Sequence, residues 1–308
     1  MENKRVAIVI VTYNGQSWID KCIKPLYGFE YVKIIVIDNN SSDNTVEIIK
    51  EKFPLVHLIN SNINLGFGKA NNYGFDYAMS NNFDFVFLLN QDASIDYLTL
   101  KKLIHSYQQD NSIGILSPVH YKNEAEVENV FEFYLKDSNI SFSEVGSLNI
   151  TDIKFVNAAL WLISLENLKK IGGFNPLYFH YGEDVDFVNR VKYNQLKIKV
   201  DLSCRGFHYR NYTKENFKKK FDKSRYFGSW DIKYYTILTN INNSNIKVFF
   251  DTFKLFFKSF FKYLIKGYFS SSLICFKVYF NVLKQAIKIT NNRKLMMFAK
   301  SPFLNLTK

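Results

Sequence analysis

Four clusters of polar residues, each directly after an apolar run, are the part of this sequence best suited to chemistry. The clusters are Thr12–Gly15, Asp38–Asp43, Asn60–Gly68 and Asn90–Asp92. Their carboxylates, amides and hydroxyls are groups that bind metals, phosphates and sugars, although the same residue types also make turns. Four clusters in the same relation to an apolar run favour one shared ligand crevice over four unrelated turns.

The apolar runs before these clusters predict strands that are covered on both faces. They are Val6–Val11, Val32–Ile37, Leu55–Ile59 and Phe83–Leu89. Continuous β-branched and aliphatic runs of this kind are typical of parallel strands. Segments with helical spacing separate them, so the pattern predicts an α/β fold with a doubly wound sheet. Such sheets bind ligands beyond the carboxyl ends of their strands, which is where the four clusters are expected to meet.

Three carboxylates stand close together further along the chain. Glu183, Asp184 and Asp186 open a predicted helix, Val185–Tyr193. Acidic residues in a first helical turn are favoured by the helix dipole. A carboxylate in the same place is also able to act as a general base that takes a proton from a reacting hydroxyl.

Taken in order, the motifs resemble those of the inverting glycosyltransferases of family 2, which have the GT-A fold. The quoted motifs are Val9–Asn14, Ile37–Asp43, Asn64–Gly74, Leu88–Asp92, Gly172–Pro176, Tyr181–Phe187 and Phe207–His208. The resemblance covers roughly residues 5–210 and is greatest to the rhamnosyltransferase-type enzymes that build bacterial surface polysaccharides. It implies a Rossmann-like, nucleotide-diphospho-sugar transferase domain.

The resemblance implies that the polar clusters bind a nucleotide-diphosphate sugar. Asp38 matches the carboxylate that pairs with a uracil or thymine ring, and Thr12 and Asn14 would lie beside the base and ribose. A glycine at position 66 allows close backbone approach, and the start of a helix attracts phosphate. The predicted donor-binding residues are Thr12, Tyr13, Asn14, Asp38, Asn40, Asn64, Gly66, Lys69, Asn72, Asn90 and Gln91.

Asp92 and His208 are the residues that the resemblance assigns to a divalent metal. The DxD motif of the family reads Asn90-Gln91-Asp92 here, so Asp92 is the remaining carboxylate. Carboxylate and phosphate oxygens suit Mg²⁺ or Mn²⁺, and a neutral imidazole suits Mn²⁺ better. The alternatives are a helix cap at Asp92 and a structural role for His208. The other histidines, interpreted as structural or surface residues, are His57, His105, His120 and His180.

The resemblance also assigns the general base and the acceptor side. Asp184 would take the proton of the acceptor hydroxyl as it attacks the anomeric carbon, and a single in-line attack inverts that carbon. Glu183 is expected to hydrogen-bond in the acceptor cleft, and Asp186 to cap the helix. Trp161 lies in a predicted strand, Phe155–Ser164, where it could stack on a sugar. A buried position is the commoner outcome for a tryptophan.

The net charge of +12 is concentrated at the end of the sequence. Residues 241–308 carry 12 basic and 1 acidic side chains, or +11, which leaves +1 for residues 1–240. In a predicted helix over 246–269 and a second over 271–289, lysines recur at nearly every turn beside aromatic residues. Charges at this density oppose a membrane span, whereas an aromatic face beside lysines is typical of a helix that lies on an anionic membrane surface. Packing on the catalytic domain or on another subunit is the alternative, and nucleic acid is disfavoured because no known module matches.

The sequence therefore predicts a glycosyltransferase in three parts. Residues 1–212 form the catalytic domain, 213–245 a helical connection and 246–308 the membrane-attached helices. The predicted donor is dTDP-rhamnose, with a UDP-hexose or UDP-galactofuranose as the alternative. The predicted acceptor is a polyprenyl-linked or growing glycan at the cytoplasmic face of the plasma membrane, where the protein would be peripheral. A homo-oligomer stays open, and a non-catalytic nucleotide-sugar-binding scaffold is the alternative from another class, because Asn90 replaces an acid.

Overall fold

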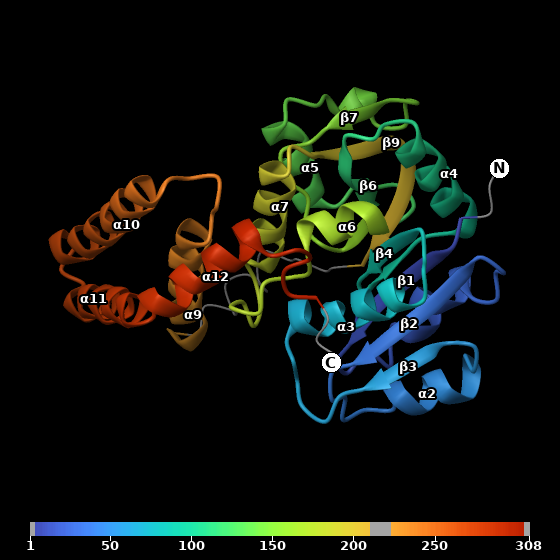
Figure 1. The fold of residues 1–308 in the computed structure, drawn as a ribbon, viewed down its shortest axis with the longest axis horizontal. Helices are drawn as coiled ribbons and strands as arrows, with labels where there is room; N and C mark the ends of the chain where they lie inside the picture. Colours follow the sequence, from blue (N-terminus) through green and yellow to red (C-terminus); the bar gives the residue numbers. More distant parts are fainter. Residues whose placement is uncertain (1–3, 210–222, 305–308) are drawn as a thin grey trace.

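A mixed β-sheet with helices on both faces forms the larger part of the molecule, and further helices extend to one side of it (Figure 1). The computed structural model describes residues 4–209 and 223–304. Within these ranges nine strands form one sheet in the order β3-β2-β1-β4-β8-β6-β9-β5, with β7 paired to β9. The strands are β1 (Val6–Thr12), β2 (Val32–Asp38), β3 (His57–Asn60), β4 (Phe85–Leu89), β5 (Ala93–Ser94), β6 (Ile113–Tyr121), β7 (Ile150–Asp152), β8 (Leu160–Ser164) and β9 (Lys197–His208).

The predicted α/β class is confirmed, and the first half of the sheet is parallel. Strands β3, β2, β1 and β4 run the same way, so their carboxyl ends meet at one edge. The second half is mixed, because β8 runs antiparallel to both β4 and β6. The strand expected over Phe155–Ser164 is shorter, starting only at Leu160, and β9 extends beyond Leu202 to His208.

Alternation along the strands divides the core into two layers. In β1, Ala7 and Val9 belong to one buried cluster, whereas Ile8 and Ile10 belong to the other, as expected when successive side chains point to opposite faces of a sheet. The first cluster is covered by α3 (Phe67–Ser80), α5 (Asn129–Asp137), α6 (Leu165–Ile171) and α7 (Glu183–Tyr193). The second is covered by α1 (Ile19–Ile23), α2 (Thr45–Lys52) and α4 (Tyr97–Gln108). Short 3₁₀ helices at Lys24–Leu26 and Phe142–Glu144 complete the connections.

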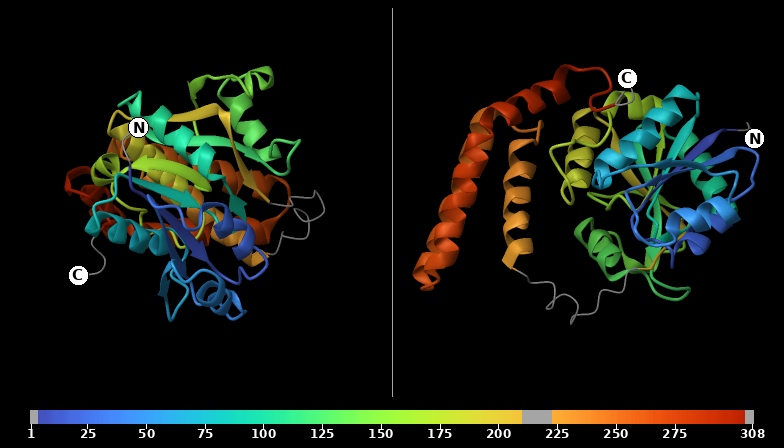
Figure 2. Two further views of the ribbon diagram at one scale, coloured as in Figure 1. Left: turned by 90° about the vertical axis from the view of Figure 1, so that its right-hand side faces the viewer. Right: turned by 90° about the horizontal axis from the view of Figure 1, so that it is seen from below.

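Four helices of the extension lie within the residues that the structure describes. They are α9 (Lys223–Leu238), α10 (Asn245–Ile265), α11 (Phe269–Lys284) and α12 (Ala286–Phe298). The helix expected over 246–269 ends earlier than predicted, because Gly267 adopts a left-handed φ of 74° and turns the chain into α11. Helix α9 lies between the α10–α11 pair and the sheet domain (Figure 2). None of the described helices is both long enough and apolar enough to cross a membrane. The predicted boundary between residues 212 and 213 lies outside the described residues.

A buried ion pair in α7 joins three parts of the chain. Arg190 Nε donates to Asp186 Oδ2 at 2.9 Å, and its Nη1 donates to the carbonyl of Ile171 at 2.7 Å. Asn175 Nδ2 donates to Asp186 Oδ1 at 3.2 Å and exchanges hydrogen bonds of 2.8 and 2.9 Å with Asn292 of α12. Asp186, for which a capping role was expected, is therefore the partner of a buried arginine.

The segment after α12 returns to the sheet domain. Gly173 N donates to the carbonyl of Pro302 at 2.8 Å, and Leu304 belongs to the same buried cluster as β1. Thr239, after α9, also contacts this region, since its hydroxyl lies 2.8 Å from that of Tyr178. The helical extension is thus attached to the sheet domain near both of its ends.

Removing the Arg190 guanidinium should be strongly destabilising. We expect Arg190→Met to lower the free energy of unfolding by about 3–5 kcal/mol, because it leaves the Asp186 carboxylate buried without its partner. Urea denaturation followed by circular dichroism measures the loss. As a control, Lys52→Met removes the exposed pair with Asp20 and should cost less than about 1 kcal/mol. Equal losses in the two variants would contradict the prediction.

Candidate functional site

A pocket of about 390 Å³ opens at the edge where the parallel strands end. Its walls come from the ends of β1, β2 and β4, from the loop before α3 and from the loop before α7. The lining residues are Val11, Tyr13, Asn39, Asn64, Gly66, Phe67, Asn90, Gln91, Asp92, Phe179 and His180. Five predicted donor-binding residues and one predicted metal ligand are therefore brought together here.

The side chain of Gln91, in the loop after β4, bonds to the loop after β1. Tyr13 N donates to Gln91 Oε1 at 2.9 Å, and Gln91 Nε2 donates to the Tyr13 carbonyl at 3.2 Å. Any side chain at Gly15 would meet the Gln91 amide, with a Cβ only 2.5 Å from Oε1. Because both ends of the amide are used, Gln91 shapes the pocket and holds Tyr13 at its mouth, where 49% of the tyrosine is exposed.

Asp38 and Thr12 lie beneath the pocket. Asp38 Oδ1 accepts hydrogen bonds from Thr12 Oγ1 at 2.9 Å and from Ser41 Oγ at 2.6 Å, and Oδ2 accepts one from Ser41 N at 2.8 Å. Both side chains are buried, so in this structure they order the loops around the pocket. Asn14 accepts from Ser42 N at 2.8 Å, and Asn40 is exposed. Contacts of these residues with a base or ribose stay predictions.

Asn39, which sequence reasoning passed over in favour of Asn40, organises the loop before α3. Its Nδ2 donates to Asn64 Oδ1 at 2.9 Å, and its Oδ1 accepts from Leu65 N at 2.7 Å. Gly66 has a φ of 78°, and a Cβ there would lie 2.1 Å from the carbonyl of Phe179. The loop before α7 therefore rests directly on the loop before α3, which only a glycine at position 66 permits.

Two residues that were candidates for ligand contacts are fully buried in this structure, which for Trp161 is the alternative that the sequence favoured. Asn72 donates to the Phe174 carbonyl at 2.8 Å and accepts from Phe174 N at 2.6 Å, so its amide connects α3 to the following half of the domain. Trp161 lies in the core, with ring centroids 6.2 Å from Phe174 and 5.5 Å from Phe187, and cannot stack on a sugar. Lys69 is half-buried in the first turn of α3 and is not among the pocket-lining residues, so its role stays a prediction.

Asp92, which lines the pocket, approaches His208, which is fully buried and is not itself a lining residue. His208 Nε2 lies 3.5 Å from Asp92 Oδ1, because β5 pairs with the end of β9 and places Ala93 opposite His208. This separation leaves room for one cation bonded to both atoms at about 2.1 Å. The alternative role of Asp92 as a helix cap is wrong, since Asp96 caps α4 by accepting from Thr99 N at 2.9 Å.

A buried glutamate lies behind His208. Glu128 Oε2 is 3.2 Å from His208 Nδ1 and 3.7 Å from His120 Nδ1. Burial works against ionisation of Glu128, but the two neighbouring histidines lower its pKa to about 2. An ionised carboxylate only accepts hydrogen bonds, so Glu128 accepts from His208 Nδ1 and holds the imidazole with Nε2 directed towards Asp92. A carboxylate behind an imidazole is the usual support of a metal-binding histidine.

His120, Glu128 and His208 also form a group in their own right. Their ligand atoms lie within 4.8 Å of one another, and all three residues are buried. Sequence reasoning treated His120 as structural or surface and did not single out Glu128. The grouping depends on the parallel pairing of β6 with β9 and on a bridge between Tyr121 and Val127 that returns the chain to His120. Neither pairing leaves a signal in the local sequence.

Glu183 and Asp184 stand in the first turn of α7 in different surroundings. Glu183 is buried against α3, and burial together with the charge of Asp184 raises its pKa to about 8. Asp184 is partly exposed, and its Oδ1 accepts from Val185 N at 2.8 Å. At neutral pH the pair therefore holds a protonated Glu183 beside Asp184. The expected acceptor contact of Glu183 stays a prediction.

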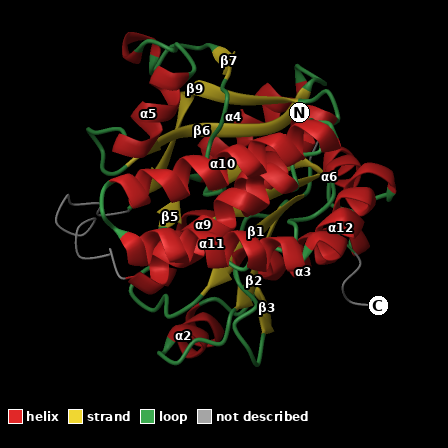
Figure 3. Cartoon of the chain, turned by 90° about the vertical axis from the view of Figure 1, so that its left-hand side faces the viewer, coloured by secondary structure: helices red, strands yellow, loops and turns green. Residues whose placement is uncertain are grey.

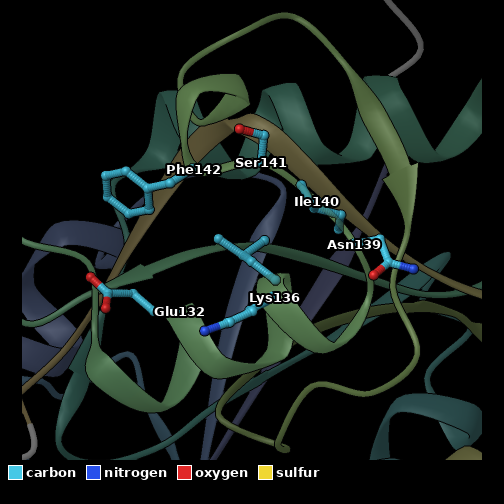
Figure 4. A pocket seen from close by; sticks show the side chains of 7 residues that line it. Glu132, Lys136, Asn139, Ile140, Ser141 and Phe142 are labelled. Atoms are coloured by element: carbon cyan, nitrogen blue, oxygen red, sulfur yellow. The ribbon is translucent and has the colours of Figure 1, made fainter.

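A second pocket, of about 550 Å³, lies between α5 and the turn that follows it (Figure 4). Its lining residues are Glu132, Leu135, Lys136, Asn139, Ile140, Ser141 and Phe142. This set contains no residue of the site at the sheet edge, and we assign the pocket no part in the chemistry.

Comparison with known families gives two matches. The sequence model described as Glycosyl transferase family 2 matches residues 7–171, which is more than half of the 308-residue chain. A model described as the N-terminal domain of galactosyltransferase matches residues 154–214. The first match includes the four polar clusters, and the second includes Asp184 and His208.

Curated relatives are glycosyltransferases of low sequence identity. The chain is 23% identical to rhamnosyltransferase WbbL of Escherichia coli, over 70% of this chain and 87% of that protein. It is 24% identical to the low-salt glycan biosynthesis hexosyltransferase Agl10 of Haloferax volcanii, over 63% of each. It thus spans less than two thirds of the length of Agl10.

Solved structures share the fold at still lower identity. S. aureus TarS in complex with UDP has a TM-score of 0.53 and 16% identity, over 76% of this chain and 65% of that one. GalNAc-T7 with UDP, GalNAc and Mn²⁺ has a TM-score of 0.53 and 14% identity, over 68% of this chain and 44% of that one. With the family match, this likeness confirms the predicted GT-A fold.

The raised pKa of Glu183 predicts a pH-dependent stability. An unfolded glutamate ionises near pH 4.5, whereas folded Glu183 ionises near pH 8, so stability falls as the pH rises between these values. Glu183→Gln removes this penalty. We expect the variant to match the wild type at pH 4.5 and to exceed it at pH 8.5 by at least about 1.4 kcal/mol, which corresponds to one unit of pKa.

Urea unfolding at both pH values measures the difference. Glu132→Gln, at an exposed position of α5, is the matched control and should change stability equally at both. A Glu183→Gln variant with the same stability difference at pH 4.5 and pH 8.5 would contradict the prediction.

Proposed function

Because the chain belongs to glycosyl transferase family 2, it is a transferase that acts in glycan biosynthesis, and we propose that it moves one sugar from a nucleotide-diphosphate donor to a hydroxyl of a cell-surface glycan, with inversion. The observation that carries the proposal is the pocket that Asp92 lines, with His208 Nε2 3.5 Å from the Asp92 carboxylate. Membership of this family favours an enzyme over the alternative of a non-catalytic nucleotide-sugar-binding scaffold.

The pocket supports donor binding through its two loops. The exposed ring of Tyr13 offers a face for a base, and Asn39 and Asn64 supply amides at the start of α3. The N-terminus of this 14-residue helix favours phosphate oxygens. The solved neighbours TarS and GalNAc-T7 contain UDP, which supports a nucleotide-sugar donor for this chain.

Asp92 and the neighbouring His208 fit a divalent cation. Asp92 Oδ1 and His208 Nε2 would hold it, with Glu128 fixing the imidazole from behind. A carboxylate and an imidazole are ligands that Mn²⁺ accepts. When bound, such a cation would supply positive charge for the diphosphate leaving group. The protein positions both side chains before the substrate arrives.

Asp184 is the base in this proposal. Since Glu183 is protonated at neutral pH, Asp184 is the carboxylate of the pair that can take a proton. It would accept the proton of the acceptor hydroxyl while that oxygen bonds to the anomeric carbon from the side opposite the leaving diphosphate. The new glycosidic bond then has the inverted configuration.

For the donor we propose dTDP-rhamnose, which is supported by the similarity to a rhamnosyltransferase over most of that protein's length. A UDP-hexose or UDP-galactofuranose is the second candidate, favoured by the UDP and UDP-GlcNAc in the TarS structures. The proposed acceptor is a polyprenyl-linked or growing surface glycan. Such an acceptor places the enzyme at the cytoplasmic face of the plasma membrane, as a peripheral protein.

A donor panel tests the proposal directly. Purified protein with Mn²⁺ is incubated with dTDP-rhamnose, UDP-glucose, UDP-GlcNAc and UDP-galactofuranose, and slow donor hydrolysis is followed by release of the nucleoside diphosphate. We expect dTDP-rhamnose to be hydrolysed fastest and EDTA to stop the reaction. Preference for a UDP-sugar would select the second candidate, and neither hydrolysis nor binding of any nucleotide sugar would overturn the donor assignment altogether.

Loss of the base should reduce turnover without removing donor binding. We expect Asp184→Asn to lower kcat for transfer by at least about 100-fold, because general bases contribute factors of about 10²–10⁴. The affinity for the nucleoside diphosphate, measured by calorimetry, should stay within about twofold. Asp137→Asn, at an exposed site of α5, is the control. A variant at position 184 with wild-type kcat would show that another group takes the proton.

A further inference from the structure

The α10–α11 hairpin carries an exposed apolar face that the catalytic site does not use. Its members on α10 are Phe249, Phe253, Phe257 and Phe261, and on α11 they are Phe276, Phe280 and Leu283. Each of these side chains is between 37% and 61% exposed. Neighbouring rings contact one another along each helix, with centroids 4.3 Å apart for Phe253–Phe257 and 4.4 Å for Phe276–Phe280. We call these seven residues the aromatic face.

The same three-step pattern repeats along both helices. At five of the seven positions of the aromatic face, a buried residue comes directly before and a lysine or an asparagine directly after. The exceptions are Phe249, which is followed by the exposed Phe250, and Phe261, which follows the half-buried Phe260. Examples are Phe256-Phe257-Lys258 in α10 and Cys275-Phe276-Lys277 in α11. Since successive residues of an α-helix are about 100° apart, the aromatic residues form one row beside the buried face and the lysines form the next row out.

The two rows of the aromatic face lie on the same side of the hairpin. The helices are antiparallel: the ring of Phe256 stacks on that of Tyr279 at 4.4 Å, while Phe260, one turn later, accepts a hydrogen bond from Ser272, which comes earlier in α11. When two helices run antiparallel, rows of residues that lie at the same angle from the contact between the helices are on the same side of the pair. Helix α9 occupies the space between the hairpin and the sheet domain, so α10 and α11 form the outermost layer (Figure 3).

The charge beside the aromatic face is almost entirely positive. Residues 246–288 contain eight lysines and one acidic residue, Asp251. The lysines that follow the aromatic residues in the pattern are Lys254, Lys258, Lys262, Lys277 and Lys284, and all are exposed. An apolar surface with lysines along its edges fits an anionic bilayer, where the rings enter the headgroup region and the ammonium groups meet lipid phosphates.

A second copy of the chain fits this surface less well. In a symmetric dimer the same patch would meet itself, and the lysine rows of one copy would face those of the other. Nothing in the face supplies carboxylates to neutralise them, because Asp251 is the single acid of the hairpin.

From these observations we infer that the aromatic face of the α10–α11 hairpin is a docking surface for the anionic lipid bilayer. The inference rests on the proposed function, because that function explains why the enzyme would be held at a membrane. Lipid binding itself needs no catalysis. The hairpin lies on the bilayer surface, with its aromatic rows in the headgroup layer and the sheet domain on the other side of α9.

Vesicle flotation tests the inference with the full chain. Vesicles of phosphatidylcholine alone are compared with vesicles that contain phosphatidylglycerol at one third of the lipid. We expect the protein to float with the anionic vesicles and to be released by high salt. The double variant Lys258→Glu/Lys277→Glu should bind at least about tenfold more weakly, because each lysine near an anionic surface contributes about 1 kcal/mol, and tenfold in affinity is about 1.4 kcal/mol.

Matched controls separate the hairpin from the rest of the surface. Lys50→Glu/Lys102→Glu makes the same charge change on exposed lysines of α2 and α4, and should bind as the wild type does. Phe257→Ser/Phe276→Ser should also lose binding, whereas Phe133→Ser, at an exposed phenylalanine of α5, should not. Donor hydrolysis in solution, measured on every variant, shows that the catalytic part is folded.

The outcomes are distinguishable from failure of the proposed function. Asp184→Asn should lose transfer and keep vesicle binding, which would leave the inference standing by itself. Equal flotation of the hairpin and control variants would overturn it. Absence of flotation, together with a stable dimer in analytical ultracentrifugation that Phe257→Ser/Phe276→Ser dissociates, would overturn it in favour of a second copy.

Discussion

The arrangement of the molecule depends on the contacts made by the buried guanidinium of Arg190. It holds Asp186 in the same helix and the carbonyl of Ile171 in the preceding segment, and its faces lie near the rings of Phe187 and Phe303. Through these contacts α7, the last residue of α6 and the returning C-terminal segment all lie against the Arg190 guanidinium, whose charge must stay compensated. Since a buried arginine is costly without its carboxylate and carbonyl partners, these elements are fixed together. The position of Glu183 and Asp184 at the start of α7 follows from that constraint.

The sequence allowed the parallel half of the fold and much of the pocket to be predicted, because both depend on short-range order. Apolar runs predict β1, β2 and β4, and a parallel arrangement brings Tyr13 and Asp92 to one edge without further information. The family resemblance added His208, which the structure places 3.5 Å from Asp92. These predictions needed only residues close to the ends of strands.

What the sequence did not reveal depends on pairings between distant segments. Glu128 is near His208 only because β6 lies beside β9 in the sheet, and no local pattern reports that neighbour. The family resemblance put Asn72 near the donor, and Trp161 had stacking on a sugar and burial as alternatives. Burial decides the role of both residues, and burial is a property of the whole core. Asp186 is of a residue type that commonly caps helices, yet its partner is Arg190, one turn later in α7. In each case the residue type was informative and the tertiary surroundings selected among its uses.

The helical extension is held to the catalytic part near both of its ends. The first attachment includes Thr239 against Tyr178, and the second includes Asn292 against Asn175 and the return of Pro302 and Leu304 to the sheet domain. A domain on a single tether can swing and reach over a range of heights, whereas two attachments leave little rotational freedom. The height of the pocket above any surface on which the hairpin rests is therefore a fixed dimension of the fold. In the proposed reaction, an acceptor hydroxyl carried at a different height above that surface would not reach Asp184, so the fold itself would select among acceptors.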